Sequence, residues 1–150
     1  MAGDEGFYLS AGEGESYSIA GGVTTFKVRG DDTSGHFEIT ETTLPPGNSG
    51  TPPHIHDRRD HAFYVIDGTV DFLVGERLVH AGPGSYVFAP KGIAHRFSNP
   101  GDRDARWLQV DSIGGRELMF KELADAMPKG GPSDPAKMLE VMRRHDTRPA

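Results

Sequence analysis

The part of the chain that decides its fold opens with residues 50–66, GTPPHIHDRRDHAFYVI, and closes with residues 90–99, PKGIAHRFSN. The first two histidines of this part are two residues apart, so on a strand both side chains lie on one face. A third histidine starts an alternating apolar run, and a fourth starts another strand after a Pro and a Gly. The sequence therefore predicts that four imidazoles converge inside a small β-barrel, those of His54, His56, His61 and His95.

Short apolar runs separated by turn residues surround these histidines. The chain has 20 Gly and 11 Pro in 150 residues, and they recur between runs that are rich in aromatic and β-branched residues. Short strands with a turn about every ten residues are typical of a sandwich or a closed barrel. Asp67-Gly68, between two apolar runs, predicts a hairpin. The expected strands cover residues 23–29, 36–44, 61–66, 69–74, 77–80, 86–88, 95–98 and 107–113.

The apolar period changes to helical spacing after Gly114-Gly115. The first expected helix ends at Pro128 and Gly130-Gly131, and Ser133-Asp134-Pro135 begins the next with a capping side chain followed by Pro. We expect both helices to pack on the outside of the barrel or on a second subunit. Their apolar stripes are Leu118, Met119, Leu123, Ala126 and Met127 in the first helix, and Met138, Leu139, Val141 and Met142 in the second.

These patterns predict a single all-β domain over residues 1–150, a length that suits one domain. We place the core barrel at about residues 23–113 and the C-terminal helices at residues 114–145. Residues 1–22 show little periodicity but contain three aromatic residues, so we expect an arm that docks on the protein.

Composition narrows the classes of function. The net charge of −6 argues against a nucleic-acid partner, because neutralising phosphates requires a basic patch. No apolar run approaches the ~20 residues of a membrane span, and the acidic, Gly-rich first residues fit neither a signal nor a transit peptide. The absence of cysteine excludes disulfides, thiolate metal sites and a cysteine nucleophile. We expect a cytoplasmic protein that binds neither nucleic acid nor membrane.

The histidine pattern itself favours a metal site. A single histidine on a strand is usually a core or surface residue, and we interpret His36, His80 and His145 as surface residues. Four at this spacing, without thiolates, suit one catalytic divalent ion per chain. Zinc is our first choice, with Fe, Ni, Cu or Mn as alternatives. We interpret residues 57–60, DRRD, as a solvated loop, and Asp111 as no different from its neighbours on a strand.

The same residues resemble the two signatures of the cupin superfamily, and specifically single-domain cupins similar to bacterial quercetin dioxygenases. The second signature is Gly-x5-Pro-x-Gly-x2-His-x3-Asn, and every position of it is matched. The matching residues are Gly84, Pro90, Gly92, His95 and Asn99.

The first cupin signature is matched by His54, His56 and Gly68, with two departures. Asn48 stands where a Gly is usual, and His61 stands where the family has its glutamate ligand. Asp60 could be a slipped carboxylate ligand. We favour His61, because Gly68 keeps its spacing from position 61 and side chains alternate along a strand.

The resemblance implies a double-stranded β-helix, or jelly-roll, barrel with a ligand at each of the four histidine positions. Four neutral imidazoles leave a divalent ion with a formal charge of about +2, whereas a carboxylate in the set leaves about +1. The ion is then a stronger Lewis acid, and the carboxylate that could act as a base is missing. The chemistry therefore shifts from O₂ activation toward polarisation of a carbonyl. Some single-domain cupins are polyketide cyclases or aromatases, and a four-histidine zinc site resembles that group.

Our leading hypothesis is a cyclase or aromatase acting on an aromatic, polyketide-type molecule, with His61 and His95 as catalytic residues. A metal-bound hydroxide, or a histidine displaced from the metal, would remove a proton. The alternatives are a dioxygenase that cleaves a flavonol or an enolised diketone, and a non-catalytic binding protein. The resemblance also implies a homodimer. Six aromatic side chains could line the substrate pocket: Phe63, Phe72, Tyr86, Phe88, Phe97 and Trp107.

Overall fold

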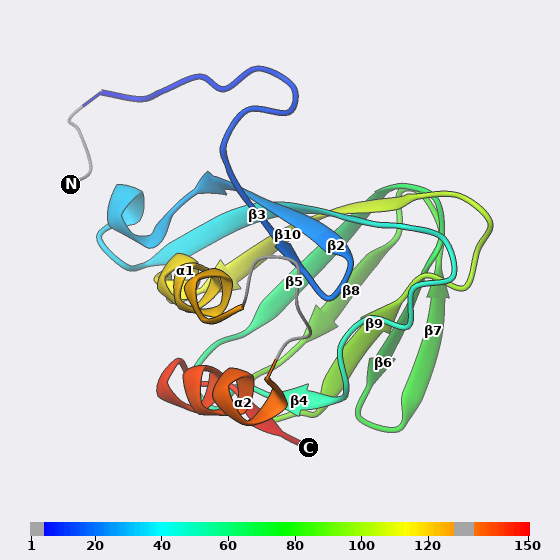
Figure 1. Ribbon diagram of the computed structural model, residues 1–150. Helices are drawn as coiled ribbons and strands as arrows, with labels where there is room; N and C mark the ends of the chain where they lie inside the picture. The colour runs from blue at the N-terminus through cyan, green and yellow to red at the C-terminus, as the bar shows by residue number, and fades with distance from the viewer. Residues whose placement is uncertain (1–4, 128–133) are drawn as a thin grey trace.

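The computed structural model describes residues 5–127 and 134–150, and these form an all-β barrel with two helices near the C-terminus (Figure 1). The larger antiparallel sheet has the strand order β1-β2-β3-β10-β5-β8, and the smaller has the order β11-β4-β9-β6-β7. The strands are β1 (Glu15–Ile19), β2 (Gly22–Val28), β3 (Phe37–Leu44), β4 (His54–Ile55), β5 (His61–Asp67), β6 (Val70–Val74), β7 (Arg77–Ala81), β8 (Tyr86–Ala89), β9 (His95–Ser98), β10 (Ala105–Ser112) and β11 (Arg148–Pro149). A short 3-10 helix, η1 (Gly30–Thr33), precedes β3.

The core lies between the two sheets. Burial alternates along β3 and β10, as expected for strands with one face against a core and the other outward. The bulkiest buried side chains at the centre are Phe63 of β5, Phe72 of β6 and Trp107 of β10, with rings 4.8 Å apart for the first pair and 6.1 Å for the second. Burying three aromatic rings supplies much of the apolar area that holds the sheets together.

The predicted hairpin at Asp67-Gly68 is wrong. The strand before it, β5, pairs with β10 and β8, whereas the strand after it, β6, pairs with β7 and β9 in the other sheet. Gly68 has a φ of 71°, and a Cβ there would lie 2.4 Å from the carbonyl oxygen of Asp104. The Asp-Gly pair therefore forms a tight corner where the chain crosses between sheets.

The first strand begins at Glu15, earlier than the expected start of the barrel near residue 23. It lies at the edge of the larger sheet, beside β2. Tyr17 packs against Phe26 of β2 and against Phe120 of the first C-terminal helix, with ring centroids 6.0 Å apart in both pairs. Part of the expected arm is thus a strand that belongs to the sheet.

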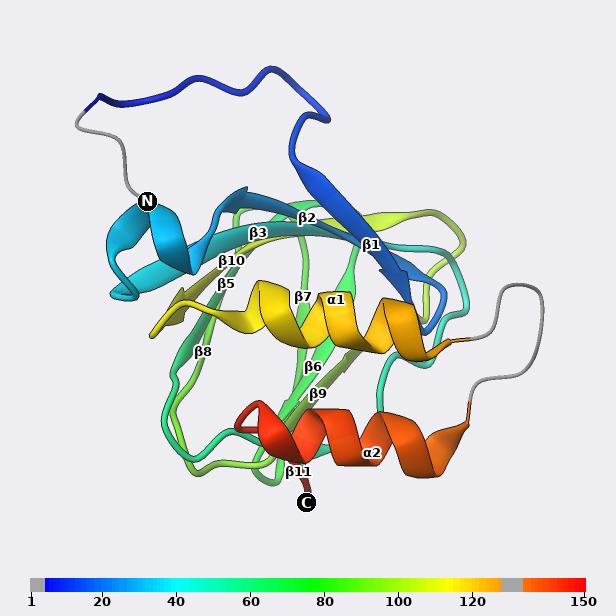
Figure 2. The same cartoon turned by 60° about the vertical axis from the view of Figure 1, so that its left-hand side comes forward.

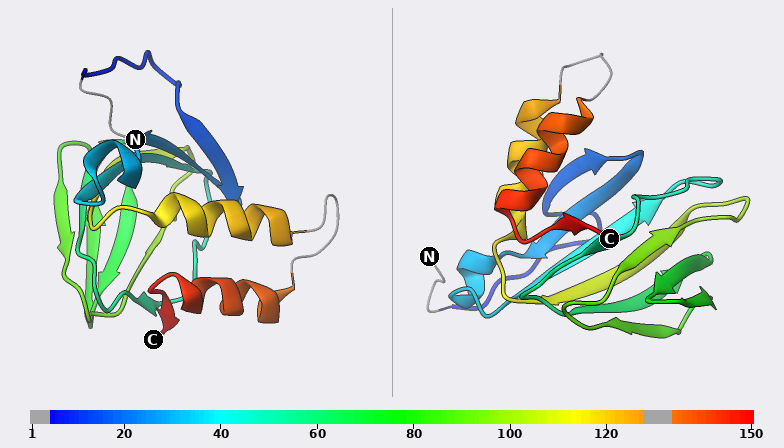
Figure 3. Two further views of the ribbon diagram at one scale, coloured as in Figure 1. Left: turned by 90° about the vertical axis from the view of Figure 1, so that its left-hand side faces the viewer. Right: turned by 90° about the horizontal axis from the view of Figure 1, so that it is seen from below.

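Two helices cover the side of the barrel that the sheets leave open (Figures 2 and 3). They are α1 (Arg116–Ala126) and α2 (Pro135–Arg144), and Asp134 caps α2 by accepting a hydrogen bond from the amide of Ala136 at 3.0 Å. The expected boundary residues 128–133 lie outside the described part of the chain. No helix in that part is long and apolar enough to cross a membrane.

The helices pack against the barrel through one apolar cluster. Buried Met119 and Leu123 of α1 meet Val141 of α2, and Ile19 of β1 packs against them. The chain then returns to the smaller sheet, because β11 pairs with β4. The C-terminal segment therefore lies beside the first two histidines.

Candidate metal centre

A tight turn before β4 sets the positions of the first two histidines. Gly50 has a φ of 68°, and a Cβ at this residue would lie 1.8 Å from the carbonyl oxygen of Phe97. Only glycine fits such a position. The chain then passes through two prolines into β4, where His54 is the cross-strand partner of His95 on β9.

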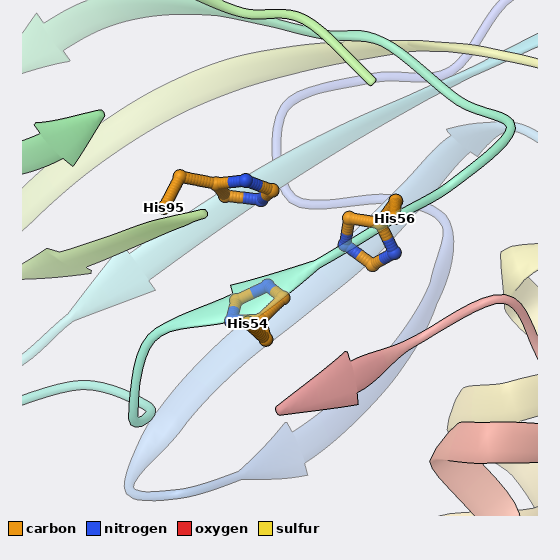
Figure 4. Close-up of side chains that lie close together, drawn as sticks. All are labelled: His54, His56 and His95. Atoms are coloured by element: carbon orange, nitrogen blue, oxygen red, sulfur yellow. The ribbon is translucent and has the colours of Figure 1, made fainter. Parts of the chain in front are cut away.

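His54, His56 and His95 form a close group between the two sheets (Figure 4). One ring nitrogen from each can be chosen so that all three lie within 4.8 Å of one another. The three side chains come from β4, from the residue after it and from the start of β9. The prediction that these residues converge is therefore confirmed, and three such imidazoles could hold a metal ion.

His61, at the start of β5, stands next to this group. Its ring centroid is 4.5 Å from that of His56 and 5.0 Å from that of His95. It is 2% exposed, and it lies outside the group of three whose ring nitrogens are within 4.8 Å of one another. The structure thus places all four predicted histidines together, with three in a tight set and His61 at its side.

Hydrogen bonds fix the orientation of all four rings. Backbone carbonyl oxygens lie near Nδ1 of three of them: Pro52 O is 3.1 Å from His54, Asp146 O is 2.8 Å from His56, and Ile93 O is 3.0 Å from His95. In His61, Nδ1 bonds to a carboxylate oxygen of Asp111. These acceptors require Nδ1 to carry the proton in each ring, which leaves Nε2 with its lone pair.

The unprotonated Nε2 atoms of the four histidines meet the requirements of a metal ligand set. Nε2 of His61 is buried without a hydrogen-bond partner among the described residues, which is costly for a polar atom unless something else binds it. Burial also lowers the pKa of His54 to about 4 and that of His95 to about 3, and it lowers the pKa of His56 still further. These three imidazoles are therefore neutral at physiological pH, as metal ligation requires. The residues fit a divalent ion.

Asp111 was missed in the sequence, although it directly contacts the site. It is fully buried on β10 and is the cross-strand partner of His61. Its second carboxylate oxygen accepts a hydrogen bond from Arg116, the first residue of α1. Burial alone would raise the pKa of Asp111, but Arg116 and His61 together lower it below its usual range, so it is ionised.

The loop at residues 57–60 is less solvated than expected. Arg59 is 6% exposed, with its guanidinium 3.7 Å from Glu38 and 3.9 Å from the carboxylate of Asp146. Asp60 does not reach the histidines, because it accepts a hydrogen bond from the amide of Lys91 at 2.8 Å. The slipped-carboxylate alternative is therefore not supported by the structure.

The C-terminal segment also takes part in the site, and the sequence carried no signal of this. Besides the Asp146 carbonyl, the hydroxyl of Thr147 lies 3.2 Å from Nδ1 of His56. The Asp146 carboxylate accepts hydrogen bonds from the amides of Asp57 and Arg58, both at 3.1 Å. Residues more than 85 positions apart in the chain thus hold the loop that follows His56.

A cavity of about 220 Å³ opens beside the histidines, between the barrel and the two helices. All four histidines line it, together with a mostly apolar wall. Among the described residues that line it, none is Asp or Glu. The apolar lining consists of Ile19, Ala20, Pro52, Phe63, Phe97, Met119, Phe120, Leu123, Met138 and Met142, and the polar lining includes Thr24, Thr42, Thr51, Gln109, Arg116 and Thr147.

The six aromatic residues expected in the pocket divide into three pairs. Phe63 and Phe97 line the cavity. Phe72 and Trp107 do not, because they fill the barrel core with exposures of 1% and 0%. Tyr86 and Phe88 are wrong as pocket residues, since alternation along β8 turns both outward, with exposures of 64% and 50%. The helices supply Phe120 in their place, which strand periodicity could not reveal.

Several signature residues shape the backbone around the histidines. The amide of Gly92, at a φ of 78°, donates to the carbonyl oxygen of His56 at 2.7 Å. Asn99 is buried and donates to the carbonyl oxygen of Leu44 at 2.9 Å. Asn48, where the first signature has Gly, accepts from the amide of Gly50 at 2.7 Å and so supports the turn before β4.

Comparisons with known proteins agree with this architecture. Residues 40–111 match the family model for the cupin domain. An 81-residue stretch is 27% identical to the xanthan biosynthesis protein XanB of Xanthomonas campestris, covering 54% of this chain and 17% of that protein. A 41-residue stretch is 46% identical to the acetate kinase EutQ of Clostridioides difficile, covering 27% of this chain and 26% of that protein. The chain therefore corresponds to a small part of these curated relatives.

Solved structures match over more of the chain. The polyketide cyclase RemF of Streptomyces resistomycificus has a TM-score of 0.64 at 23% identity, covering 72% of this chain and 80% of that one. KdgF of Halomonas sp. has a TM-score of 0.66 at 18% identity, covering 76% and 99%. A predicted oxalate decarboxylase of Thermotoga maritima has a TM-score of 0.59 at 21% identity, covering 66% and 90%. The cupin-domain match over residues 40–111 and these structural likenesses show that the chain has the cupin fold, with both histidine signatures placed in two opposed antiparallel sheets.

Proposed function

We propose that this protein is a metal-dependent enzyme that cyclises or aromatises an aromatic, polyketide-type molecule in the cavity beside the histidines. The observation that carries the proposal is His61, an imidazole where a carboxylate is usual, in a cavity with no acidic lining among the described residues. The similarity in fold to the polyketide cyclase RemF supports it.

The ligand set proposed for the ion comes from the histidine cluster. His54, His56 and His95 would hold it, with His61 as the fourth donor. A divalent ion such as zinc, bound by neutral imidazoles, supplies a Lewis acid that polarises a carbonyl and stabilises an enolate.

The cavity suits a ring-shaped, mostly apolar substrate. Phe63 and Phe97 form its wall on the barrel side, and Phe120 closes it on the side of α1. Three methionines, Met119, Met138 and Met142, complete the helical side, and their flexible side chains adapt to ligands of different outline. These side chains exclude water from the reacting carbonyl and orient the rings beside the histidines.

Proton transfer falls to a histidine, because the cavity wall offers no carboxylate among the described residues. We assign His61 to this role, in which its Nε2 would be displaced from the ion, because one lone pair cannot bind the ion and a proton at the same time. Its Nε2 lies at the side of the tight group and has no hydrogen-bond partner in the described structure, and its Nδ1 is held by Asp111. A histidine held in this way can accept a proton from the carbon beside a polarised carbonyl and return it to a leaving hydroxyl. His95 is the second candidate, because its ring lies 5.0 Å from that of His61.

Two measurements test the proposal. Elemental mass spectrometry of purified protein should find about one zinc per chain, with a marked loss in His61→Ala and no loss in His80→Ala, an exposed histidine on another part of the barrel. The zinc-loaded protein, incubated without O₂ with an aryl poly-β-ketone, should give a product that is lighter by one water, as an aldol closure with dehydration requires.

Other outcomes would favour the other functions. Consumption of O₂ with a flavonol, by protein loaded with iron, nickel, copper or manganese, would establish a dioxygenase and overturn the cyclase. If the protein binds the poly-β-ketone and the flavonol but converts neither of them, with or without O₂, it is a non-catalytic binding protein. Full metal loading of His61→Ala would show that His61 is not a ligand.

A further inference from the structure

His61 is the one histidine of the cluster whose Nδ1 is oriented by a buried side chain and not by a backbone carbonyl. Three of the four rings bond through Nδ1 to carbonyl oxygens, which stay in place whatever the side chains are. His61 differs, because its Nδ1 bonds to the side chain of Asp111. Gln109 Nε2 also lies 2.9 Å from this Nδ1, but an amide nitrogen can only donate, so Asp111 is the acceptor on which the tautomer of this ring depends.

The carboxylate of Asp111 is itself held by donors on every side. Gln109 Nε2 donates to the oxygen that faces His61, at 2.7 Å, and Arg116 donates to the other oxygen. Since both oxygens already accept hydrogen bonds from nitrogen donors, Asp111 acts as the acceptor toward His61, and His61 must donate from Nδ1. Nε2 of His61 is then obliged to carry the lone pair that faces the cluster.

Arg116, the first residue of α1, is held in turn by Glu38 of β3. One carboxylate oxygen of Glu38 accepts from the backbone amides of Gly115 and Arg116, at 2.8 and 2.9 Å. The other lies 3.7 Å from Nε of Arg116. The helix and strands β3, β5 and β10 thus meet at one buried set of polar and charged side chains that ends on the His61 ring.

We propose that Asp111 is a positioning residue for His61: held by Arg116, it locks the ring in the Nδ1–H tautomer and brings negative charge to a site whose ligands are all neutral. Such a partner raises the basicity of the opposite ring nitrogen, whether that nitrogen binds an ion or accepts a proton. The inference rests on the proposed function for its chemical purpose, but its structural content concerns the metal-free protein.

Asp111→Asn tests the effect of residue 111 on the His61 tautomer without changing the packing around it, because Asp and Asn side chains have nearly the same shape. The amide oxygen should turn toward the Arg116 guanidinium, which only donates, and the amide NH₂ should then face Nδ1 of His61. His61 would change to the Nε2–H tautomer, as happens when the aspartate of a serine-protease triad becomes asparagine. Asp71→Asn is a matched control, because Asp71 pairs with His80 at the protein surface, 2.6 Å apart.

Two readouts test the inference. Nitrogen-15 NMR of metal-free, histidine-labelled protein reports the tautomer of each ring, and we expect His61 to change from Nδ1–H to Nε2–H in Asp111→Asn only. Competition with a chromophoric chelator measures Zn²⁺ affinity, and we expect a loss of about 10- to 100-fold in Asp111→Asn and none in Asp71→Asn.

A second variant covers the case in which Asp111→Asn does not fold with Arg116 unpaired. Asp111→Leu combined with Arg116→Met removes the carboxylate and its counter-ion together, which leaves no isolated buried charge. It should also lose the Nδ1–H tautomer of His61. Persistence of that tautomer, or an unchanged Zn²⁺ affinity, in either variant would overturn the proposal. A wild-type protein that shows the predicted tautomer but has no cyclase activity would refute the proposed function alone.

Discussion

The carbonyl oxygen of Asp146 lies 2.8 Å from Nδ1 of His56, which precedes it by 90 residues. This contact makes the C-terminal segment part of the histidine cluster. The same segment continues into β11, whose Arg148 is the cross-strand partner of Ile55 in β4. The last residue also contributes, since the amide of Ala150 donates to the carbonyl oxygen of Pro53 at 3.1 Å.

Deleting residues 148–150 should therefore weaken metal binding without removing a ligand. The strand that carries His54 would lose its edge neighbour, and its backbone would open more often. We expect Zn²⁺ affinity to fall about 10-fold, as it does when a residue that hydrogen-bonds to a metal ligand is lost. Competition with a chelator measures this affinity. Arg148→Ala is the control, because it removes only the exposed ion pair with Asp57 at 2.9 Å, which is worth little. Equal affinities for the deletion and the control would contradict this role of β11.

A second prediction concerns the turn that precedes β4. Gly47 and Gly50 have almost the same φ, 69° and 68°, but only Gly50 faces a neighbour, with its missing Cβ 1.8 Å from the carbonyl oxygen of Phe97. Gly47→Ala should cost about 1 kcal/mol of unfolding free energy from backbone conformation alone. Gly50→Ala should cost several times more, roughly 3 kcal/mol or above, because the backbone of β9 must also move.

Urea unfolding of the two alanine variants measures the difference. The Gly50→Ala variant should also bind Zn²⁺ more weakly, because the displaced Phe97 is two residues from His95 on the same strand. If both variants lose the same stability, the close approach of Gly50 to β9 has no energetic effect and this prediction is wrong.

The sequence predicted the sheets well because burial on one face leaves a period of two. The expected strands from residue 36 to residue 113 match β3 and β5–β10 within a few residues. Periodicity does not say which strands share a sheet, so the corner at Gly68 was interpreted as a hairpin. The same limit applies to Tyr86 and Phe88, which share the outer face of β8 and were assigned to the pocket.

The sequence predicted the histidines of the candidate site but not the residues that hold them in position. Four histidines at signature spacing are visible in the sequence, because ligand geometry restricts both residue type and position. Asp111 is not, since it occupies one inward position of an ordinary alternating strand, and its partners His61 and Arg116 come from other elements. The contact of Asp146 with His56 is made by a backbone carbonyl, which any residue type could supply.

Stability should fall with rising pH because of Glu38. Burial raises the pKa of this carboxyl to about 8 from 4.5, against the opposing effect of Arg116. Between these two values the unfolded chain has lost the proton while the folded protein keeps it, so the folded state becomes less stable as pH rises. The slope is at most about 1.4 kcal/mol per pH unit and ends above the folded pKa.

Glu38→Gln provides the comparison, because glutamine resembles the protonated acid and does not titrate. Thermal unfolding from pH 6 to pH 9 should show the wild type losing stability relative to the variant up to about pH 8, and a constant difference above it. Parallel curves over the whole range would mean that Glu38 is already ionised in the folded protein at pH 6. That result would move Glu38 into the ion-pair set with Arg59 and Arg116.

The last prediction concerns the aromatic residues on the outer face of the larger sheet. Tyr64 and Tyr86 are cross-strand partners, and Phe88 follows on the same face of β8; all three are about half exposed or more. Exposed apolar patches of this kind usually mark an interface. Because β8 is the edge strand of this sheet, two copies of the chain can bring the same patch together about a two-fold axis. We therefore expect a homodimer that uses this face.

Light scattering coupled to size-exclusion chromatography should give the mass of two chains for the wild type. Tyr86→Ser combined with Phe88→Ser should shift it toward the 16.3 kDa of one chain, with little loss of stability, because neither side chain is in the core. Leu78→Ser is the control, since Leu78 is similarly exposed but lies on β7 of the other sheet. A monomeric wild type would contradict the homodimer, and a double variant that stays dimeric would place the interface on another face.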